Sequence, residues 1–393
     1  MQTPVLRKGV VALLASASLL LSACSSDDGP AAGEGSSSPR ASPTSAPPAS
    51  ASPSADLPPA KGSVEVVKTL TDGLASPWGL AALPGGDLLV ASRDEATITR
   101  IDGESGRKTL LGSVPGVAPA GEGGLLGLAV APTYGADHLI YAYFTTESDN
   151  RIARLQYDEK KPAGQQLGAP DTILRGIPKG SIHNGGRIAF GPDRMLYAGT
   201  GETGDTGLAQ DKSSPSGKIL RMTPDGEPVH GNPEGDSLVY SYGHRNVQGL
   251  AWDSGKRLWA SEFGQNTWDE LNLIEPGKNY GWPDIEGKEG GSGFVDPVAQ
   301  WKTSEASPSG IAYAEGSIWM AGLRGERLWR IPLSGKADGE PSADPQAFLE
   351  GKYGRLRTVL AAGGDKLWLV TSNTDGRGTA KSGDDRILLL KVR

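Results

Sequence analysis

A phrase of turn and strand signals recurs six times between residues 78 and 372, and this repetition constrains the fold more than any other feature. Each copy has a polar or Gly-rich turn, a short apolar run, a Pro, Gly or Asp turn, and a second apolar run. Because the runs are short and their apolar residues nearly alternate, each copy predicts a pair of β-strands. The copies are WGLAALPGGDLLVAS at 78–92, LLGLAVAPTYGADHLIYAYF at 125–144, GGRIAFGPDRMLYAGTG at 185–201, VQGLAWDSGKRLWASEFG at 247–264, SGIAYAEGSIWMAGLRG at 309–325 and RTVLAAGGDKLWLVTS at 357–372.

The repeat length indicates a propeller. Further strand signals follow several copies, as in ITRID at 98–102, RIARL at 151–155 and ERLWRI at 326–331. The spacing of roughly 55 residues per copy is slightly above a kelch-type blade. Amphipathic helices are not apparent, and the 56 glycines and 29 prolines suit tight turns. We therefore predict an all-β, six-bladed β-propeller over residues 63–393; a stack of β-sandwiches would not explain a repeat of this length.

The N-terminus has the features of an export signal. Arg7 and Lys8 precede an apolar run that is shorter than the ~20 residues that span a bilayer. The sequence Leu-Ser-Ala-Cys at 21–24 resembles the lipobox of bacterial lipoproteins, in which the cysteine is acylated. This predicts a signal peptide at 1–23, a lipid anchor on Cys24, and attachment to the outer face of the cell membrane. An ordinary signal peptide with an incidental cysteine is the alternative. No disulfide can form within the chain, because Cys24 is its only cysteine.

Residues 24–62 are mostly Ser, Pro, Ala and Gly with scattered charge. Such a segment buries too little apolar surface to offset its ordering entropy, so we expect a disordered tether. The whole chain carries a net charge of −7, and removal of a basic signal peptide makes it more acidic. This argues against a nucleic-acid partner, which requires a basic face.

One motif is misleading. GTGETG at 199–204 matches the dinucleotide fingerprint G-x-G-x-x-G, but the following DTGLAQDKSSPSG cannot open a helix. Without a helix N-terminus there is nothing to receive a pyrophosphate, so a nicotinamide cofactor is not expected. Zinc is not expected either, because the chain has no Cys–His cluster.

A histidine and a carboxylate form the candidate catalytic pair. His183 lies in IHNGGRIAF at the start of a predicted strand, and Glu202 follows the next strand. Antiparallel neighbours can bring the two side chains together, and an imidazole oriented by a carboxylate is the usual unit for general-base catalysis. A hydrogen-bonded turn histidine is the alternative that the local sequence leaves open.

Basic and amide side chains recur where blades begin or turn. Arg355 and Arg357 lie two residues apart, on one face of a strand. Arginine clusters bind carboxylates in bidentate fashion, whereas single arginines are usually solvated surface charges. The segment SEFGQNTWDELNLIEPGKNYGWPDIEG at 261–287 is rich in oxygen donors and suits Ca²⁺. The candidate group consists of Arg245, Asn246, Arg324, Arg355 and Arg357.

These motifs together resemble the soluble quinoprotein glucose/sorbosone dehydrogenases, which include bacterial aldose sugar dehydrogenases. The resemblance covers essentially all of 63–393, in order. Its motifs are GEGGLLGLA at 121–129, HNGGR at 183–187, GHRNVQGLAW at 243–252, SEFGQNTWDELNLI at 261–274, NYGWP at 279–283 and RLR at 355–357.

The resemblance implies a six-bladed propeller that uses pyrroloquinoline quinone (PQQ) and Ca²⁺ to oxidise a sugar and pass electrons to an external acceptor. His183 resembles the base that takes the sugar hydroxyl proton, and Glu202 resembles the acid that holds it. The residues matching positions beside the quinone are Glu122, Arg245, Asn246, Arg324, Arg355 and Arg357. Gly264 and Gln265 would offer carbonyls to the cofactor calcium, and Glu270 and Tyr280 would hold a second calcium.

Some positions depart from the family pattern. Glu122 stands where glutamine is common, Arg324 replaces a lysine, and Phe263 and Gln265 replace a glutamine and a proline beside the calcium. A carboxylate beside an anionic cofactor is unfavourable unless it is protonated or paired.

Two other classes of function are alternatives to this expectation. A non-catalytic glycan- or protein-binding propeller would keep the fold but lose His183 or the arginines. A calcium-dependent lactonase would need several carboxylates around a central ion. The expectation is a PQQ- and calcium-dependent dehydrogenase of an aldose or related alcohol.

Overall fold

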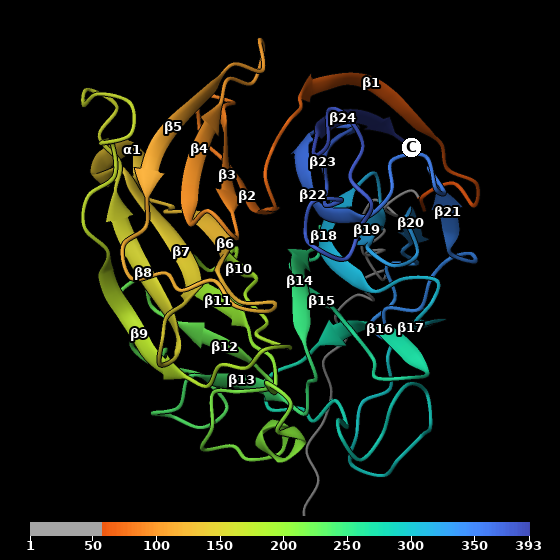
Figure 1. The fold of residues 1–393 in the computed structure, drawn as a ribbon. Coiled ribbons are helices and arrows are strands. Elements are labelled where there is room, and N and C mark those ends of the chain that lie inside the picture. The colour runs from red at the N-terminus through yellow and green to blue at the C-terminus, as the bar shows by residue number, and fades with distance from the viewer. Residues whose placement is uncertain (1–56) are drawn as a thin grey trace, which may run out of the picture. The chain divides into compact units, whose positions relative to one another are not determined.

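The computed structural model describes residues 57–393, so the predicted signal peptide, Cys24 and most of the predicted tether lie outside the described part of the chain. Residues 57–393 form six four-stranded sheets in which every strand pair is antiparallel (Figure 1). This confirms the predicted all-β, six-bladed β-propeller. Within these residues, helical structure is limited to α1 (Tyr134–Asp137) and a 3-10 turn, η1 (Thr206–Ala209). Neither is long or apolar enough to cross a membrane.

The first three blades are formed by consecutive strands, ordered from the propeller axis outward. Blade 1 consists of β2 (Pro77–Ala82), β3 (Leu88–Ser92), β4 (Thr97–Ile101) and β5 (Lys108–Ser113). Blade 2 consists of β6 (Leu125–Val130), β7 (Leu139–Thr145), β8 (Asn150–Gln156) and β9 (Asp171–Ile177). Blade 3 consists of β10 (Ile188–Phe190), β11 (Leu196–Gly199), β12 (Lys218–Met222) and β13 (Val239–Tyr242).

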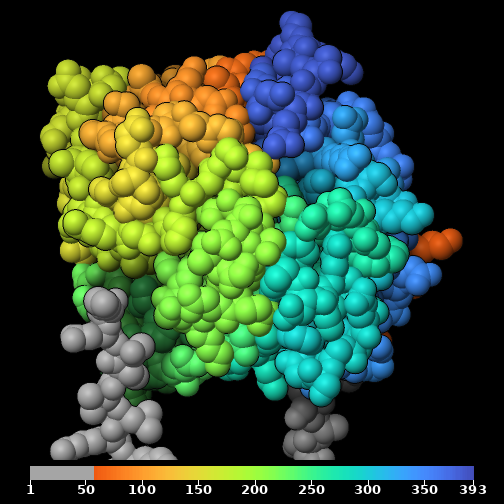
Figure 2. All heavy atoms as spheres, turned by 60° about the horizontal axis from the view of Figure 1, so that its bottom comes forward, coloured from red at the N-terminus to blue at the C-terminus, as the bar shows by residue number. Residues whose placement is uncertain are grey.

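The last blade is completed by the N-terminal strand. Blade 4 consists of β14 (Val247–Trp252), β15 (Leu258–Glu262), β16 (Trp268–Ile274) and β17 (Ala299–Lys302). Blade 5 consists of β18 (Pro308–Ala314), β19 (Ser317–Gly322), β20 (Arg327–Pro332) and β21 (Gln346–Phe348). Blade 6 consists of β22 (Leu356–Gly363), β23 (Lys366–Thr371), β24 (Ile387–Val392) and, as its outer strand, β1 (Val64–Thr71). The blue C-terminal blade therefore lies beside the orange N-terminal segments (Figures 1 and 2). This pairing closes the ring, and the repeat pattern did not predict it.

The compact part of the chain begins before the predicted boundary at residue 63. The Pro59 carbonyl accepts a hydrogen bond from Arg330 Nη2 at 2.8 Å, and the Gly62 amide donates to Gln346 Oε1 at 2.8 Å. Both partners belong to blade 5. The last residues of the predicted tether are thus bound to the propeller, because their backbone groups find partners on its surface.

The inner strands approach one another closely around the axis. Each one contacts the next, from β2 through β6, β10, β14, β18 and β22 and back to β2. A Cβ at Gly79 would collide with the backbone of Leu126 and Leu128, and one at Gly127 would collide with the Gly186 carbonyl. Side chains cannot be accommodated where these backbones meet. The recurrent glycine of the repeat is therefore required by the convergence of the blades.

Apolar side chains fill the space between neighbouring blades in six clusters. In β7, Ile140 and Phe144 pack toward blade 1, whereas the alternating Tyr141 and Tyr143 pack toward blade 3. Because both faces of a sheet are covered, its strands are apolar at nearly every position, as in parallel sheets that are buried on both sides. Each large side chain that is fully buried stabilises the fold by about 1.5–3 kcal/mol.

Candidate active site

A cavity of about 640 Å³, here called the main cavity, opens at one end of the propeller. Its walls come from two sets of loops: those that lead into the first strand of a blade and those that follow the second strand. Strand direction brings both sets to the same end. The lining residues are Trp78, Arg93, Glu122, Ile182, His183, Arg245, Gln248, Phe263, Ser307, Leu323, Arg324, Arg355, Arg357, Asp375 and Arg377.

The predicted catalytic pair is formed. His183 precedes β10 and Glu202 follows β11, and His183 Nδ1 is in hydrogen-bond contact with Glu202 Oε1. Glu202 is almost fully buried and its other oxygen accepts from the Gly204 amide at 2.7 Å. A carboxylate only accepts, so Nδ1 carries the proton and Nε2 is left as the acceptor. This is the tautomer that general-base catalysis requires.

The backbone around His183 is held from two sides. Its φ is +54°, a left-handed conformation that non-glycine residues rarely adopt. The His183 amide donates to Glu122 Oε2 at 2.9 Å, and the Gly185 amide donates to Asn246 Oδ1 at 2.9 Å. Asn246, which was predicted to contact the quinone, is fully buried and supports the His183 loop. Its Nδ2 has no partner within residues 57–393.

Arg245 lines the main cavity as predicted, and it also contacts the loop that was predicted to bind calcium. Its Nη1 donates to the carbonyls of Gly264 at 2.6 Å and Phe263 at 3.3 Å. Its guanidinium carbon lies 5.3 Å from the centre of the Trp282 ring, and burial lowers the pKa of Arg245. The Gly264 carbonyl, a predicted calcium donor, therefore accepts from the guanidinium in this arrangement. A carbonyl oxygen has two lone pairs, so this contact leaves one of them for a further partner.

Gln265 belongs to a loop that wraps a carboxylate. Glu286 Oε1 accepts from four successive amides, those of residues 265–268, at 2.7–3.1 Å. The N–H and C=O of a peptide point in opposite directions. The carbonyls of Gly264 and Gln265 are therefore turned away from Glu286, as the prediction of carbonyl donors requires.

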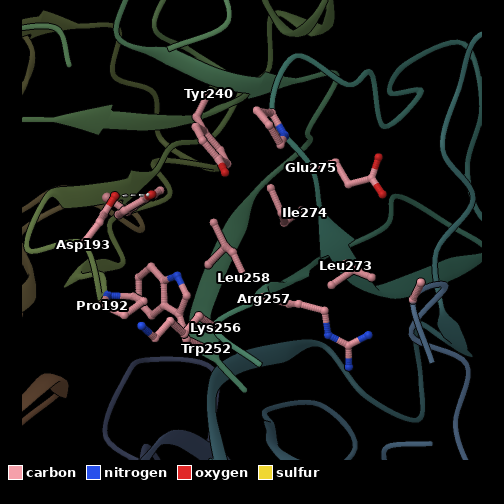
Figure 3. A pocket seen from close by; sticks show the side chains of 13 residues that line it. Pro192, Asp193, Tyr240, Trp252, Lys256, Arg257, Leu258, Leu273, Ile274 and Glu275 are labelled. Atoms are coloured by element: carbon pink, nitrogen blue, oxygen red, sulfur yellow. Dashed lines mark hydrogen bonds between the residues drawn. The ribbon is translucent and has the colours of Figure 1, made fainter. Parts of the chain in front are cut away.

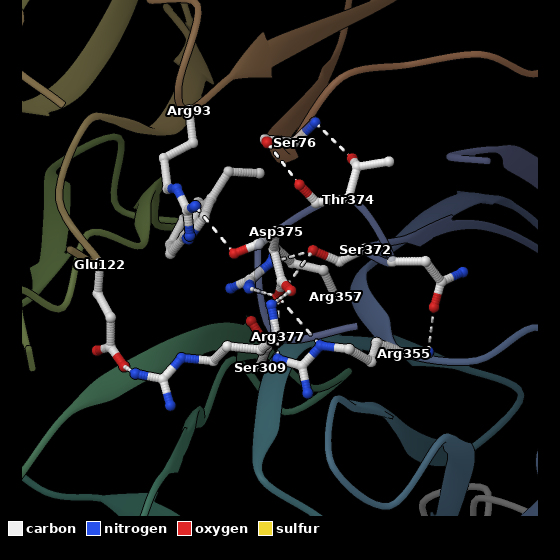
Figure 4. Close-up of polar contacts among 12 residues, drawn as sticks. Ser76, Arg93, Glu122, Ser309, Arg355, Arg357, Ser372, Thr374, Asp375 and Arg377 are labelled. Carbon is white, nitrogen blue, oxygen red and sulfur yellow. Dashed lines mark hydrogen bonds and ion pairs between the residues drawn. The ribbon is translucent and has the colours of Figure 1, made fainter. Parts of the chain in front are cut away.

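Arg355 and Arg357 share a carboxylate that the sequence analysis missed. Asp375 Oδ2 accepts from Arg355 Nη2 and from Arg357 Nη2, both at 2.9 Å (Figure 4). Burial favours the neutral acid, but the positive charges of Arg357 and Arg355 outweigh it and lower the pKa of Asp375. Burial lowers the pKa of Arg357 to about 10. Asp375 thus pre-positions the two guanidiniums that we predicted to bind the quinone.

Three other arginines complete the wall. Arg324 was predicted and is exposed at the cavity edge. Arg93 and Arg377 were not predicted; Arg93 donates to the Asp375 carbonyl at 3.1 Å, and Arg377 pairs with Glu122 at 2.8 Å. All three follow the second strand of a blade, as Glu202 and Gly264 do. This shared position in the repeat is the sequence signal that could have identified them.

A further arginine lies beneath the cavity. Arg187 takes the place in blade 3 that glycine holds in several other blades, and it fills the channel instead. It donates to the Gln248 carbonyl at 2.7 Å and lies 4.5 Å from the centre of the Trp78 ring. Burial, and then the charge of Arg357, lowers the pKa of Arg187 to about 9. The base of the main cavity is therefore also electropositive.

The predicted second calcium site is only partly assembled. Asn272 Nδ2 donates to both Glu262 and Glu270, at 2.9 and 3.0 Å, and its Oδ1 has no partner within residues 57–393. Burial, and then the charge of Glu262, raises the pKa of Glu270 to about 8. Two buried carboxylates and an unpaired amide oxygen suit a hard cation.

Tyr280 does not supply its hydroxyl to this group. That hydroxyl donates to the Leu273 carbonyl at 2.7 Å and accepts from the Glu275 amide at 2.8 Å, while the ring stacks on His244. Of the atoms of Tyr280, the hydroxyl is therefore already used by the backbone. The prediction that Glu270 and Tyr280 hold a second calcium stays a prediction. The described residues contain no group of three or more His, Cys, Asp or Glu arranged around a metal position.

A second cavity, of about 400 Å³, is lined by residues at the opposite end of the strands. Figure 3 shows the side chains that line it. The lining includes Pro192 and Asp193 in the turn after β10 and Tyr240, Trp252 and Lys256 nearby. None of the predicted site residues reaches it, and no histidine lines it. The predicted His183 and the predicted arginines thus line the main cavity and not this one.

Comparison with known proteins identifies the family. The glucose/sorbosone dehydrogenase family model matches residues 74–388. The chain belongs to this family. It is 31% identical to the aldose sugar dehydrogenase YliI of Escherichia coli, over 77% of this chain and 81% of that protein. It is 30% identical to quinoprotein glucose dehydrogenase B of Acinetobacter calcoaceticus, over 63% of this chain and 59% of that protein.

A comparison with solved structures supports the same family. The PQQ-bound aldose sugar dehydrogenase of Streptomyces coelicolor is 76% identical, with a TM-score of 0.84, and the match covers 86% of this chain and all of that one. The resemblance inferred from the motifs is confirmed, and the protein is an oxidoreductase of the sugar dehydrogenase class.

The main cavity suits an anionic cofactor. Six arginines line it against two carboxylates, Glu122 and Asp375, and both carboxylates are already paired with arginines. Buried guanidiniums whose charges are not fully compensated favour an anionic ligand. Arg245 Nε has no partner within residues 57–393, although it is buried. The residues present therefore fit a multiply charged carboxylate such as PQQ.

We expect Asp375→Ala to destabilise the protein strongly. Removal of one member of a buried ion pair leaves uncompensated charge and typically costs about 3–5 kcal/mol. Denaturant unfolding of the cofactor-free protein measures this loss. Asp193→Ala, at the opposite end of the propeller, is the comparison; equal losses in the two variants would contradict a special role for Asp375.

Proposed function

We propose that this family member oxidises the anomeric hydroxyl of an aldose, or a related alcohol, with PQQ as the hydride acceptor. The observation that carries the proposal is the juxtaposition, in one cavity, of the His183–Glu202 pair and the arginine cluster. The bound cofactor reported for the Streptomyces relative supports it. The product would be a lactone or related carbonyl compound, and the electrons would leave to an external acceptor.

The proton of the sugar hydroxyl passes to His183 in this proposal. Its Nε2 is the acceptor, because Nδ1 is held by Glu202. The buried Glu202 carboxylate fixes the ring orientation and stabilises the imidazolium that forms. The Gly204 amide holds Glu202 in turn, so the acceptor nitrogen is positioned before the sugar arrives.

The arginines bind and orient the cofactor carboxylates in this proposal. The groups available are Arg245, Arg324, Arg355 and Arg357, with Arg93 and Arg377 beside them. PQQ supplies a quinone that accepts two electrons, which the side chains cannot do themselves. The protein provides charge complementarity and exclusion of water around the reacting hydroxyl.

The alternative functions are less well supported. A calcium-dependent lactonase needs side-chain carboxylates around one ion, whereas the lining carboxylates of the main cavity are two and both pair with arginines. A non-catalytic propeller has no need for a buried His–Glu pair beside an anion-binding wall.

We expect His183→Ala to reduce turnover by about 10²–10⁴-fold, the usual contribution of a general base. PQQ affinity and melting temperature should stay near the parent values. Dye-coupled sugar oxidation, PQQ titration and thermal unfolding of one preparation give the three quantities. Glu202→Gln should have a smaller effect on turnover, and His230→Ala, an exposed histidine, serves as control. If His183→Ala lowers the melting temperature but leaves turnover unchanged, the histidine is structural.

Calcium is part of the proposal at the Glu270 site. In the metal-free protein, the pKa of Glu270 is raised from 4.5 to about 8, so the folded state binds the proton more tightly than the unfolded chain. The associated stability is complete below pH 4.5 and is lost as the pH rises through about 8. Bound Ca²⁺ would compensate the ionised carboxylates instead.

We therefore expect Ca²⁺ to raise the melting temperature of chelator-treated protein at pH 8.5 much more than at pH 5. Glu270→Gln should raise the melting temperature of metal-free protein at pH 8.5 by about 2 °C or more, and it should abolish the calcium response. Glu289→Gln, an exposed neighbour, should do neither. A calcium response that persists in Glu270→Gln would place the ion elsewhere.

The lipid anchor on Cys24 also remains a proposal. It rests on the lipobox-like sequence and the preceding signal features. We expect Cys24→Ser to release the protein into the medium or to block processing, as membrane fractionation would measure. A variant that fractionates with membranes like the parent would contradict the anchor.

A further inference from the structure

An ion pair between Glu122 and Arg377 joins two sides of the main cavity. Glu122 lies in the loop before β6, and Arg377 lies in the loop between β23 and β24, so the pair connects loops 255 residues apart (Figure 4). Glu122 Oε1 accepts from Arg377 Nη2 at 2.8 Å, while Oε2 accepts from the His183 amide at 2.9 Å. The pair therefore touches the backbone of the proposed catalytic base.

Both members are fixed by their own backbones. The Glu122 amide donates to the Ser181 carbonyl at 2.9 Å, and a Cβ at Gly121 would collide with the same carbonyl. The Arg377 amide donates to Asp375 Oδ1 at 2.9 Å. Glu122 is thus attached to the His183 loop and Arg377 to the arginine cluster.

The pair is the more accessible part of the cavity wall. The side chain of Arg377 is 61% exposed and that of Glu122 is 21% exposed, whereas that of Asp375 is 2% exposed. A ligand that enters the cavity from solvent can therefore contact this pair directly. Of the two carboxylates in the wall, Glu122 is the one whose charge reaches the opening.

An arginine-rich cavity would by itself attract any anion, because a cleft lined by one sign of charge concentrates ligands of the opposite sign. Arg377 offers a guanidinium that would bind a sugar carboxylate in bidentate fashion. Glu122 occupies that guanidinium and repels a second carboxylate. The hydroxyls of a neutral sugar can instead donate to Glu122 and accept from Arg377.

We propose that the Glu122–Arg377 pair makes this enzyme select neutral aldoses over sugar acids such as uronates. The inference rests on the proposed sugar oxidation and names its substrate class. Selectivity arises here from an unfavourable interaction with the wrong substrate. The proposed selectivity also gives a reason why a glutamate stands at position 122, where glutamine is common in the family.

The test compares D-glucose with D-glucuronate. In Glu122→Gln the amide oxygen can still accept from the His183 amide, but Arg377 loses its counter-charge. We expect the ratio of kcat/KM for glucuronate to that for glucose to rise about tenfold at low salt, the effect of one charge-assisted hydrogen bond. The rise should shrink at high ionic strength.

The double variant Glu122→Gln/Arg377→Gln should return the ratio to near the parent value, because the released guanidinium is gone. Glu234→Gln, which breaks the Lys212–Glu234 pair outside the cavity, should leave the ratio unchanged. An unchanged ratio in Glu122→Gln, or a gain that survives in the double variant, overturns the proposal.

Calorimetry with methyl β-D-glucuronide and methyl β-D-glucoside gives a readout that does not depend on turnover, because their anomeric positions are blocked. Glu122→Gln should bind the glucuronide more tightly than the parent does, while the affinity for the glucoside should change little. An unchanged affinity for the glucuronide would count against the proposed role of the pair.

If the parent neither binds PQQ nor oxidises glucose, the proposed function itself has failed. If it does both and the ratio does not respond, only the selectivity assignment has failed.

Discussion

The close approach of the inner strands at the propeller axis is the constraint on which the other features depend. Gly79 and Gly127 allow neighbouring backbones to meet without intervening side chains. Six sheets can then pack face to face around a narrow channel and bury both of their surfaces. Blades 3 and 6 lack this glycine and carry Arg187 and Thr358 in its place, and blade 3 is the informative case. Arg187 stands at this position, extends into the channel against Trp78, and places a buried positive charge beneath the cavity.

The electrostatics of the site contrast with those of the whole chain. The protein is acidic, with a net charge of −7, yet six arginines converge on one cavity. Such a cluster would repel itself without internal counter-charges. Asp375 supplies one between Arg355 and Arg357, and Glu122 supplies another at the opening. These carboxylates position the guanidiniums before any ligand binds, so less ordering is required on binding.

The proposed catalytic base and the proposed selectivity pair share one set of loops. The His183 amide is bound by Glu122, while the His183 ring is bound by Glu202. The left-handed backbone of His183 therefore persists because two side chains from different loops hold it. This arrangement links the charge at the opening to the backbone of the proposed base. A substitution at position 122 that removes both side-chain oxygens would therefore act on both, whereas Glu122→Gln keeps an oxygen for the His183 amide.

The sequence by itself determined the six blades, the family, and the pairing of His183 with Glu202, because each depends on periodicity or on motifs that are contiguous in the chain. It also indicated Arg245, Arg324, Arg355 and Arg357. Only the tertiary structure decided how these groups are shared. Arg377 and the closing strand β1 act through contacts between residues far apart in sequence. Asp375 and Arg245 instead meet their partners within one blade, and Tyr280 bonds to the nearby backbone of Leu273 and Glu275. Local sequence specifies which end of a strand a side chain occupies, but the loop geometry and the circular arrangement of six blades specify which charges meet.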